Sequence, residues 1–221
     1  HLCDRRQRQM CIRDRLIGSL ILLSACTEGR VESVNHENEF VENIVSKMTI
    51  DEKIGQMLQD APYNERLGIP RMMYSECLHG LWLEGATVFP QAIALGSTWN
   101  PELIKKMTSY IAKEARGIGV THCYSPNLDV SIGDARYGRI EESYGEDPYL
   151  VSRMGVAFIK GLQGEGDEYL DENHIIATAK HFVAYPENRT GLNGAFSDVS
   201  LRRLYEICLL YTSPSPRDGL L

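Results

Sequence analysis

The central stretch of the chain reads VTHCYSPNLD at residues 120–129, a short apolar and β-branched run that ends in polar side chains. Two runs of the same kind lie on either side of it, at residues 71–76 and 175–184. Helical patterns separate the three runs, and each pattern begins with a capping residue followed by proline, at Asn100-Pro101 and Asp147-Pro148. Strands and helices that alternate in this order predict a parallel sheet with helical crossovers, and therefore an α/β fold.

The ends of the expected helices are marked by local signals. Glycines at 117–119 and 161–164 follow the two central helical patterns and indicate where they stop. Residues 39–48 carry apolar side chains at helical spacing, and Thr49 with Glu52 forms a capping box that starts a second N-terminal helix. Ser200 is the expected cap of a last helix.

Polar residues gather at the C-terminal ends of the three strand-like runs. They are Ser75 and Glu76, then residues 127–129, then Lys180 and His181. In α/β barrels this is the face on which chemistry is built, but doubly wound sheets also bind ligands there. The pattern therefore predicts a site at this edge without choosing between the two architectures.

The composition sets limits on function. The net charge of −7 argues against nucleic-acid binding, which needs a basic face. No strand is followed by a GxGxxG fingerprint, which disfavours a dinucleotide-binding oxidoreductase, and no cofactor is expected.

Cys77 and Cys123 are predicted to be two small buried thiols, in preference to a disulfide or a metal pair, and no metal site is expected.

Both ends of the chain differ in composition from its body. Residues 1–15 and 208–221 resemble translated adaptor read-through, so we expect a non-native leader and a non-native tail. A natural basic leader and a natural proline-rich tail are the alternative.

Residues 16–26 read LIGSLILLSAC, an apolar run too short to span a bilayer. It resembles a bacterial lipoprotein signal, with Cys26 as the lipidated residue and residues 27–38 as a polar tether. An ordinary cleaved signal peptide is the alternative. Either interpretation predicts an exported protein, periplasmic or anchored to the outer membrane, whose contact with the membrane is limited to the lipid.

Five motifs follow one another through residues 39–207, the credible body of the chain. In order they resemble the N-terminal barrel of glycoside hydrolase family 3, which implies an incomplete (β/α)8 TIM-barrel-like domain. The five motifs are Ser75–Gly80 (SECLHG), Phe89–Ala92 (FPQA), Pro126–Asp129 (PNLD), Asp134–Pro148 (DARYGRIEESYGEDP) and Ala179–Phe182 (AKHF).

The chemistry of the motif residues suits a sugar, because a pyranose ring carries hydroxyls that both donate and accept hydrogen bonds. A carboxylate accepts from them, while lysine and arginine donate to them. The resemblance assigns Glu76, Arg139, Lys180 and His181 to binding the terminal, non-reducing sugar. Two alternatives involve no ligand: Glu76 and Arg139 form a structural ion pair, or His181 is a residue of the core. Asp129 is expected to be structural.

The family resemblance implies an exo-acting retaining β-glycosidase of β-glucosidase type that acts on small carbohydrate substrates. A retaining reaction needs a nucleophile and an acid/base. Neither is found here, since the family's Ser-Asp-Trp-like motif is missing and the acid/base usually comes from a second domain. We therefore expect this polypeptide to be inactive by itself. A β-xylosidase of the same family and an exported, non-catalytic sugar-binding lipoprotein are the alternatives. The sequence after His181 departs from the β-N-acetylglucosaminidase signature, which disfavours that branch.

Overall fold

The computed structural model describes residues 39–57 and 63–209, which fall into two compact units divided between Arg71 and Met72. The expected leader, signal, tether and Cys26 lie outside the described residues, as does the tail beyond residue 209. None of the described helices combines the length and the apolar composition that crossing a bilayer requires.

The first unit contains two helices, as the sequence predicts. Residues 39–47 are helical, and α2 spans Ile50–Met57. The predicted capping box is formed, because Glu52 N donates to Thr49 Oγ1 at 3.2 Å and Thr49 N donates to Glu52 Oε2 at 2.8 Å. The apolar side chains of both helices are largely exposed, and α2 contains no buried residue.

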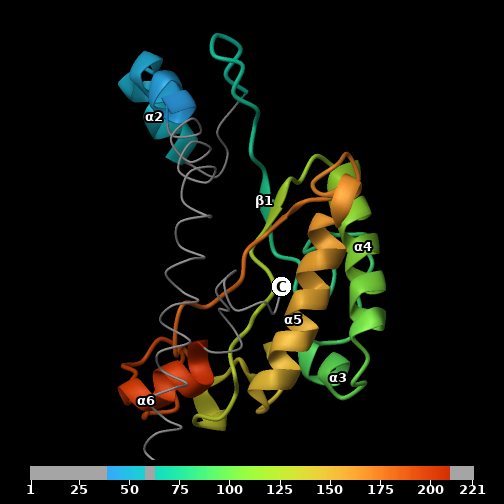
Figure 1. The fold of residues 1–221 in the computed structure, drawn as a ribbon, viewed down its shortest axis with the longest axis vertical. Helices are drawn as coiled ribbons and strands as arrows, with labels where there is room; N and C mark the ends of the chain where they lie inside the picture. The colour runs from blue at the N-terminus through green and yellow to red at the C-terminus, as the bar shows by residue number, and fades with distance from the viewer. Residues whose placement is uncertain (1–38, 58–62, 210–221) are drawn as a thin grey trace, which may run out of the picture. The chain divides into compact units, whose positions relative to one another are not determined.

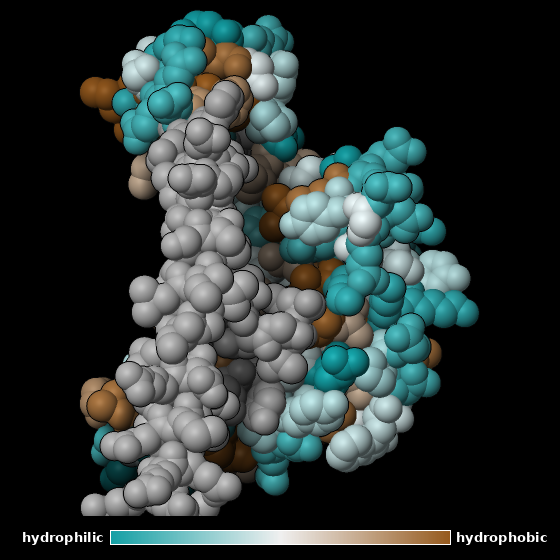
Figure 2. Space-filling model, in the orientation of Figure 1, coloured by the Kyte–Doolittle hydropathy of each residue, from teal (hydrophilic) through white to brown (hydrophobic). Residues whose placement is uncertain are grey.

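The second unit is built on a three-stranded parallel sheet in the order β1-β2-β3. Its register places Tyr74 beside His122, and His122 beside Ile176. The two longest helices, α4 and α5, pack side by side (Figure 1). On the face viewed in Figure 2, the side chains over these two helices are largely hydrophilic. The strands are β1 (Tyr74–Ser75), β2 (His122–Cys123) and β3 (Ile176–Ala177); the helices are α3 (Ala92–Gly96), α4 (Pro101–Gly117), η1 (Ala135–Tyr137), η2 (Ile140–Glu142), α5 (Pro148–Gln163), η3 (Gly166–Glu168), α6 (Leu201–Arg203) and η4 (Leu204–Leu209).

Each predicted helix start in this unit is confirmed by a side-chain cap. Asn100 Oδ1 accepts from Leu103 N at 3.1 Å at the start of α4, and Asp147 Oδ1 accepts from Tyr149 N at 2.9 Å at the start of α5. Ser200 Oγ accepts from Arg203 N at 3.2 Å and begins α6. These caps satisfy backbone N–H groups that have no partner within their own helix.

The strands are shorter than predicted. Each predicted run has six to ten residues, but only two residues of each run form a strand. Hydrogen bonds between the runs continue past the ladders, since Tyr124 N donates to Ser75 O at 3.0 Å and Thr178 N donates to Cys123 O at 3.0 Å. The backbones of the second and third runs meet again at a parallel bridge between Asn127 and Lys180.

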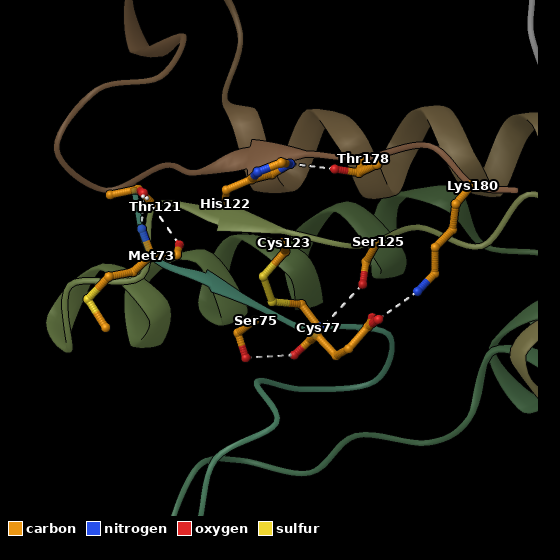
Figure 3. The surroundings of a disulfide bond; sticks show 10 residues. Met73, Ser75, Cys77, Thr121, His122, Cys123, Ser125, Thr178 and Lys180 are labelled. Atoms are coloured by element: carbon orange, nitrogen blue, oxygen red, sulfur yellow. Dashed lines mark hydrogen bonds and ion pairs between the residues drawn. A yellow bond between two sulfur atoms is a disulfide. The ribbon is translucent and has the colours of Figure 1, made fainter. Parts of the chain in front are cut away.

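Side chains of the sheet alternate between two sides, as expected for β-structure. Cys77, Cys123 and Ile175 are at most 1% exposed and belong to the core cluster that includes α4 and α5. Tyr74 and Tyr124 lie on the other side, where their rings stack with centroids 5.4 Å apart. His122 Nε2 contacts Thr178 Oγ1 on the same side (Figure 3).

The prediction of two separate buried thiols is wrong, because Cys77 and Cys123 form a disulfide (Figure 3). The register pairs Ser75 with Cys123, so Cys77 follows on the same side of the sheet. The two Cα atoms are 5.8 Å apart, a separation that suits a disulfide. The cysteines are 46 residues apart in sequence, so only the strand register could reveal this pairing.

Candidate functional site

The candidate site lies at the C-terminal ends of the three strands, where the sequence predicts it. Glu76 comes directly after β1, Asp129 follows β2, and Lys180 with His181 follows β3. The parallel sheet brings these three chain segments to one edge, which explains why residues more than 50 positions apart are neighbours here.

Lys180 and Glu76 form one ion pair of the site. Lys180 Nζ donates to Glu76 Oε1 at 2.7 Å, and the two side chains are 15% and 30% exposed. The second carboxylate oxygen, Oε2, is buried and has no hydrogen-bond partner among the described residues. A buried acceptor without a partner is costly unless a ligand supplies the missing donor. Glu76 is therefore ready to accept a hydrogen bond from a bound hydroxyl.

Arg139 binds Glu142 through two N–H groups on one edge of its guanidinium group. Nε donates to Oε1 at 2.9 Å and Nη2 donates to Oε2 at 2.5 Å. Burial raises the pKa of Glu142, but the hydrogen bonds and charge of Arg139 outweigh this effect and lower it overall. The hydrogen bonds to Glu142 raise the pKa of Arg139 although burial opposes the shift. The alternative of a Glu76–Arg139 ion pair is wrong, because each residue has a different partner.

Sequence reasoning did not identify Glu142 as part of the site. Glu142 could have been identified from its position three residues after Arg139, because an i, i+3 spacing places opposite charges on one side of a helical turn. Asn127 adds a contact of 3.4 Å from Nδ2 to Glu142 Oε2, and it is 1% exposed.

His181 is held by Asp129. The imidazole Nδ1 lies 2.7 Å from Asp129 Oδ2, and the Asp129 side chain is 2% exposed. The main-chain N–H of His181 donates to the other carboxylate oxygen at 3.4 Å. Because a carboxylate accepts at Nδ1 and Arg139 Nη1 lies 3.2 Å from Nε2, we infer that the hydrogen of a neutral imidazole is on Nδ1. Asp129 is structural, as expected, and what it positions is His181.

Tyr185 packs against both His181 and Arg139. Its ring stacks on the imidazole with centroids 4.3 Å apart, and Arg139 Cζ lies 5.4 Å from the same ring centroid. Stacking and cation–π contacts of this kind restrict the orientation of both polar groups. No local pattern in the sequence marks Tyr185 for this role.

Two hollows adjoin the cluster. The larger has a volume of about 420 Å³, and its polar lining residues are Glu76, His79, Arg139 and Glu142. The smaller, of about 50 Å³, is lined in part by Lys180 and His181. The four predicted site residues therefore divide equally between two adjoining hollows.

The described part of the chain is equipped to bind a polyhydroxylated ligand. It offers one free carboxylate oxygen beside an ammonium group, with a guanidinium group and an imidazole nearby. Glu142 is tied to Arg139 and Asp129 is tied to His181. The described residues hold no group of three or more His, Cys, Asp or Glu side chains that could bind a metal ion.

Comparisons with known proteins show which family the chain matches. The family model described as the glycosyl hydrolase family 3 N terminal domain matches residues 3–211. A protein named Beta-xylosidase from Formosa agariphila is 64% identical over 201 residues, which cover 88% of this chain and 28% of that protein. A protein named Beta-glucosidase from Rhizobium radiobacter is 34% identical over 181 residues, which cover 76% of this chain and 21% of that protein.

Solved structures resemble the chain as well. A β-glucosidase from Erythrobacter marinus matches with a TM-score of 0.63 and 38% identity, covering 72% of this chain and 20% of that one. A β-glucosidase from Listeria innocua in complex with glucose matches with a TM-score of 0.65 and 29% identity, covering 77% of this chain and 30% of that one. These matches confirm the α/β fold, a partial TIM-barrel-like domain. The chain spans between a fifth and a third of the length of these relatives.

Proposed function

The chain belongs to glycosyl hydrolase family 3, and from this we propose that the full-length gene product is an exo-acting, retaining β-glycosidase. The observation that carries the proposal is the cluster at the strand ends, in which Glu76 keeps one unpartnered carboxylate oxygen beside the Lys180 ammonium group. A terminal pyranose supplies both the donor that this oxygen lacks and the acceptors that the ammonium group can still use.

The remaining groups of the cluster complete the recognition of the sugar. Lys180 uses one of its three protons on Glu76 and has two left to donate. Arg139 is fixed by Glu142, and His181 by Asp129, so both present their polar edges in a defined direction. Hydrogen bonds to sugar hydroxyls can strengthen in the oxocarbenium-like transition state, so these residues should affect turnover as well as binding.

We propose β-xylosides as the preferred substrates. The sequence alone places β-glucosides first, but the 64% identical relative is named a β-xylosidase. The specific support for β-glucosides is the similarity to the Listeria innocua β-glucosidase, which was solved with glucose. The two sugars differ by one hydroxymethyl group, and such a difference is read by the shape of the pocket.

The test uses purified full-length protein with p-nitrophenyl β-xyloside and p-nitrophenyl β-glucoside. We expect hydrolysis of both, with the higher kcat/KM for the xyloside. Lys180→Ala should lower kcat/KM by about tenfold or more, the usual effect of losing hydrogen bonds from a charged group. Lys106→Ala removes a lysine outside the site and is the matched control. A full-length protein that binds sugar but hydrolyses neither compound would refute the proposal and favour the non-catalytic sugar-binding protein.

We propose that the 221-residue chain alone binds sugar without hydrolysing it. The described residues support this, since the Glu142 carboxylate is engaged by Arg139 and the Asp129 carboxylate by His181. Release of p-nitrophenol by the purified chain would contradict it.

We also propose export of the protein as a lipoprotein, with Cys26 as the acylated residue and no other contact with the membrane. The support is the sequence of residues 16–26. Labelled fatty acid should be incorporated into the full-length protein and not into its Cys26→Ala variant; labelling of both, or of neither, would refute the assignment.

A further inference from the structure

The Cys77–Cys123 disulfide lies one residue away from the candidate site. Both cysteines are 0% exposed and belong to the core cluster, so the bond itself is out of reach of a ligand. Cys77 directly follows Glu76, which comes after the last residue of β1. The last paired residues of the first two strands are Ser75 and Cys123. The disulfide therefore joins the two chain segments at a level where the strand ladder has already ended.

The second run holds the backbone on both sides of Glu76. On one side, the Ser75 carbonyl accepts a hydrogen bond from this run at 3.0 Å. On the other side, Cys77 N donates to Ser125 Oγ at 3.0 Å, and the disulfide joins Cys77 to Cys123 (Figure 3). The main-chain position from which the Glu76 side chain extends is thus set by the second run.

The same run also holds Lys180, the partner of Glu76 in the ion pair. Lys180 N donates to Pro126 O at 3.0 Å, and Leu128 N donates to Lys180 O at 2.5 Å. The carboxylate and the ammonium group are therefore fixed to one stretch of backbone. Lys180 is attached to it by these hydrogen bonds, whereas the segment of Glu76 is also attached by a covalent bond.

The free oxygen of Glu76 shows why a covalent attachment matters here. Glu76 Oε2 is buried and has no hydrogen-bond partner among the described residues. A buried acceptor in this state costs free energy, and a segment that could shift would lower the cost by turning the carboxylate toward water. A covalent bond at the next residue limits such a shift. The carboxylate is then already in position when a sugar arrives, so binding does not have to order it.

We propose that the Cys77–Cys123 disulfide is a positioning element for sugar binding, which keeps the Glu76 carboxylate in place beside Lys180 while no ligand is bound. This inference rests on the proposed function, because it concerns the carboxylate that binds the terminal sugar. The bond acts through Glu76 and does not contact the sugar. Its loss should therefore weaken catalysis only as long as Glu76 is present.

The test is a double-mutant cycle in the full-length enzyme, which separates an effect through Glu76 from a general effect on the fold. The four proteins are wild type, Cys77→Ala/Cys123→Ala, Glu76→Ala and the combination of all three substitutions. The readout is kcat/KM for p-nitrophenyl β-xyloside or β-glucoside, whichever the wild type hydrolyses faster, calculated per folded enzyme with the folded fraction from circular dichroism. Loss of the disulfide should lower kcat/KM by about tenfold when Glu76 is present and by less than about twofold when it is absent.

Two further variants make the result specific. Cys77→Val/Cys123→Ala also lacks the bond but keeps more apolar volume in the core, and it should give the same result in both backgrounds. Gly161→Ala perturbs the packing of α5 against α4, since its Cβ atom would meet Thr108 and Lys105, and it leaves the strand ends unchanged. It should alter kcat/KM per folded enzyme by less than about twofold in both backgrounds.

The possible failures are distinguishable. A wild-type protein that hydrolyses neither compound refutes the proposed function and this inference with it. In an active wild type, peptide mapping that finds Cys77 and Cys123 as free thiols refutes the positioning role alone. So does an equal loss of kcat/KM with and without Glu76, or no loss in either background. Failure of both cysteine pairs to fold would assign the bond to the stability of the fold and would also refute the positioning role.

Discussion

Replacing Asp129 by asparagine tests whether this residue positions His181. The carboxylate accepts from two donors, His181 Nδ1 at 2.7 Å and the His181 main-chain N–H at 3.4 Å. An amide of the same shape has only one acceptor oxygen, so in Asp129→Asn one of the two donors must face the NH2 group. The Asp129 side chain is 2% exposed, which leaves little room for water to replace the lost acceptor.

The size of the effect follows from these contacts. A hydrogen bond to a charged group contributes about 1.5–3 kcal/mol, and one between neutral groups about 0.5–1.5 kcal/mol. The substitution therefore costs about 1–2 kcal/mol at the site, which corresponds to a loss of about 5- to 30-fold in kcat/KM if the orientation of His181 matters for the transition state.

The assay measures kcat/KM of the full-length enzyme and the ¹⁵N chemical shifts of the His181 ring. Asp129→Asn should lower kcat/KM and change the balance between the Nδ1–H and Nε2–H forms of the imidazole. Asp198→Asn is the control, since Asp198 pairs with Arg189 on the surface, where the side chains are 54% and 73% exposed. The reasoning is refuted if the two variants have kcat/KM values within about twofold of each other.

Three predictions concern stability. Gly161→Ala should destabilise the fold by about 1–3 kcal/mol, because a Cβ atom there would clash with α4, whereas Gly117→Ala should not, because its Cβ atom would meet nothing within 4 Å; urea denaturation distinguishes them. The pKa of Glu142 is lowered in the folded protein, so its contribution is complete above the usual carboxyl range and is lost as the pH falls through the lowered value. The difference in unfolding free energy between wild type and Glu142→Gln should therefore shrink from about pH 6 to about pH 3, and a constant difference would contradict this. Reducing the Cys77–Cys123 disulfide, which spans 46 residues, should remove up to about 4 kcal/mol of unfolding free energy, measured with and without dithiothreitol.

Features that depend on neighbouring residues were predictable from the sequence. The starts of α4, α5 and α6 follow from Asn100, Asp147 and Ser200, because a cap needs only its own side chain and the next turn of backbone. The same holds for the parallel α/β arrangement, since alternating runs permit few topologies. The gathering of Glu76, Lys180 and His181 then follows from the parallel sheet.

Features that depend on the packing of distant segments were not predictable. The choice of Lys180 as the partner of Glu76 is made by the geometry of the strand ends. The disulfide depends on strand register, which no local pattern encodes. Tyr185 lies in an irregular segment after β3, and its stacking on His181 leaves no periodic trace in the sequence.

The alternation of side chains along the strands has a consequence for how this domain can diverge. Glu76 and Cys77 are adjacent in sequence, yet Glu76 pairs with Lys180 at the candidate site and Cys77 is bonded to Cys123 within the core. Substitutions that change the substrate and substitutions that change the stability of the fold therefore occur at alternating positions, so selection for one interferes little with selection for the other. We expect a mutational library that varies only the positions on the same side as Glu76 to yield variants of altered specificity. It should contain far fewer misfolded clones than a library that varies whole segments.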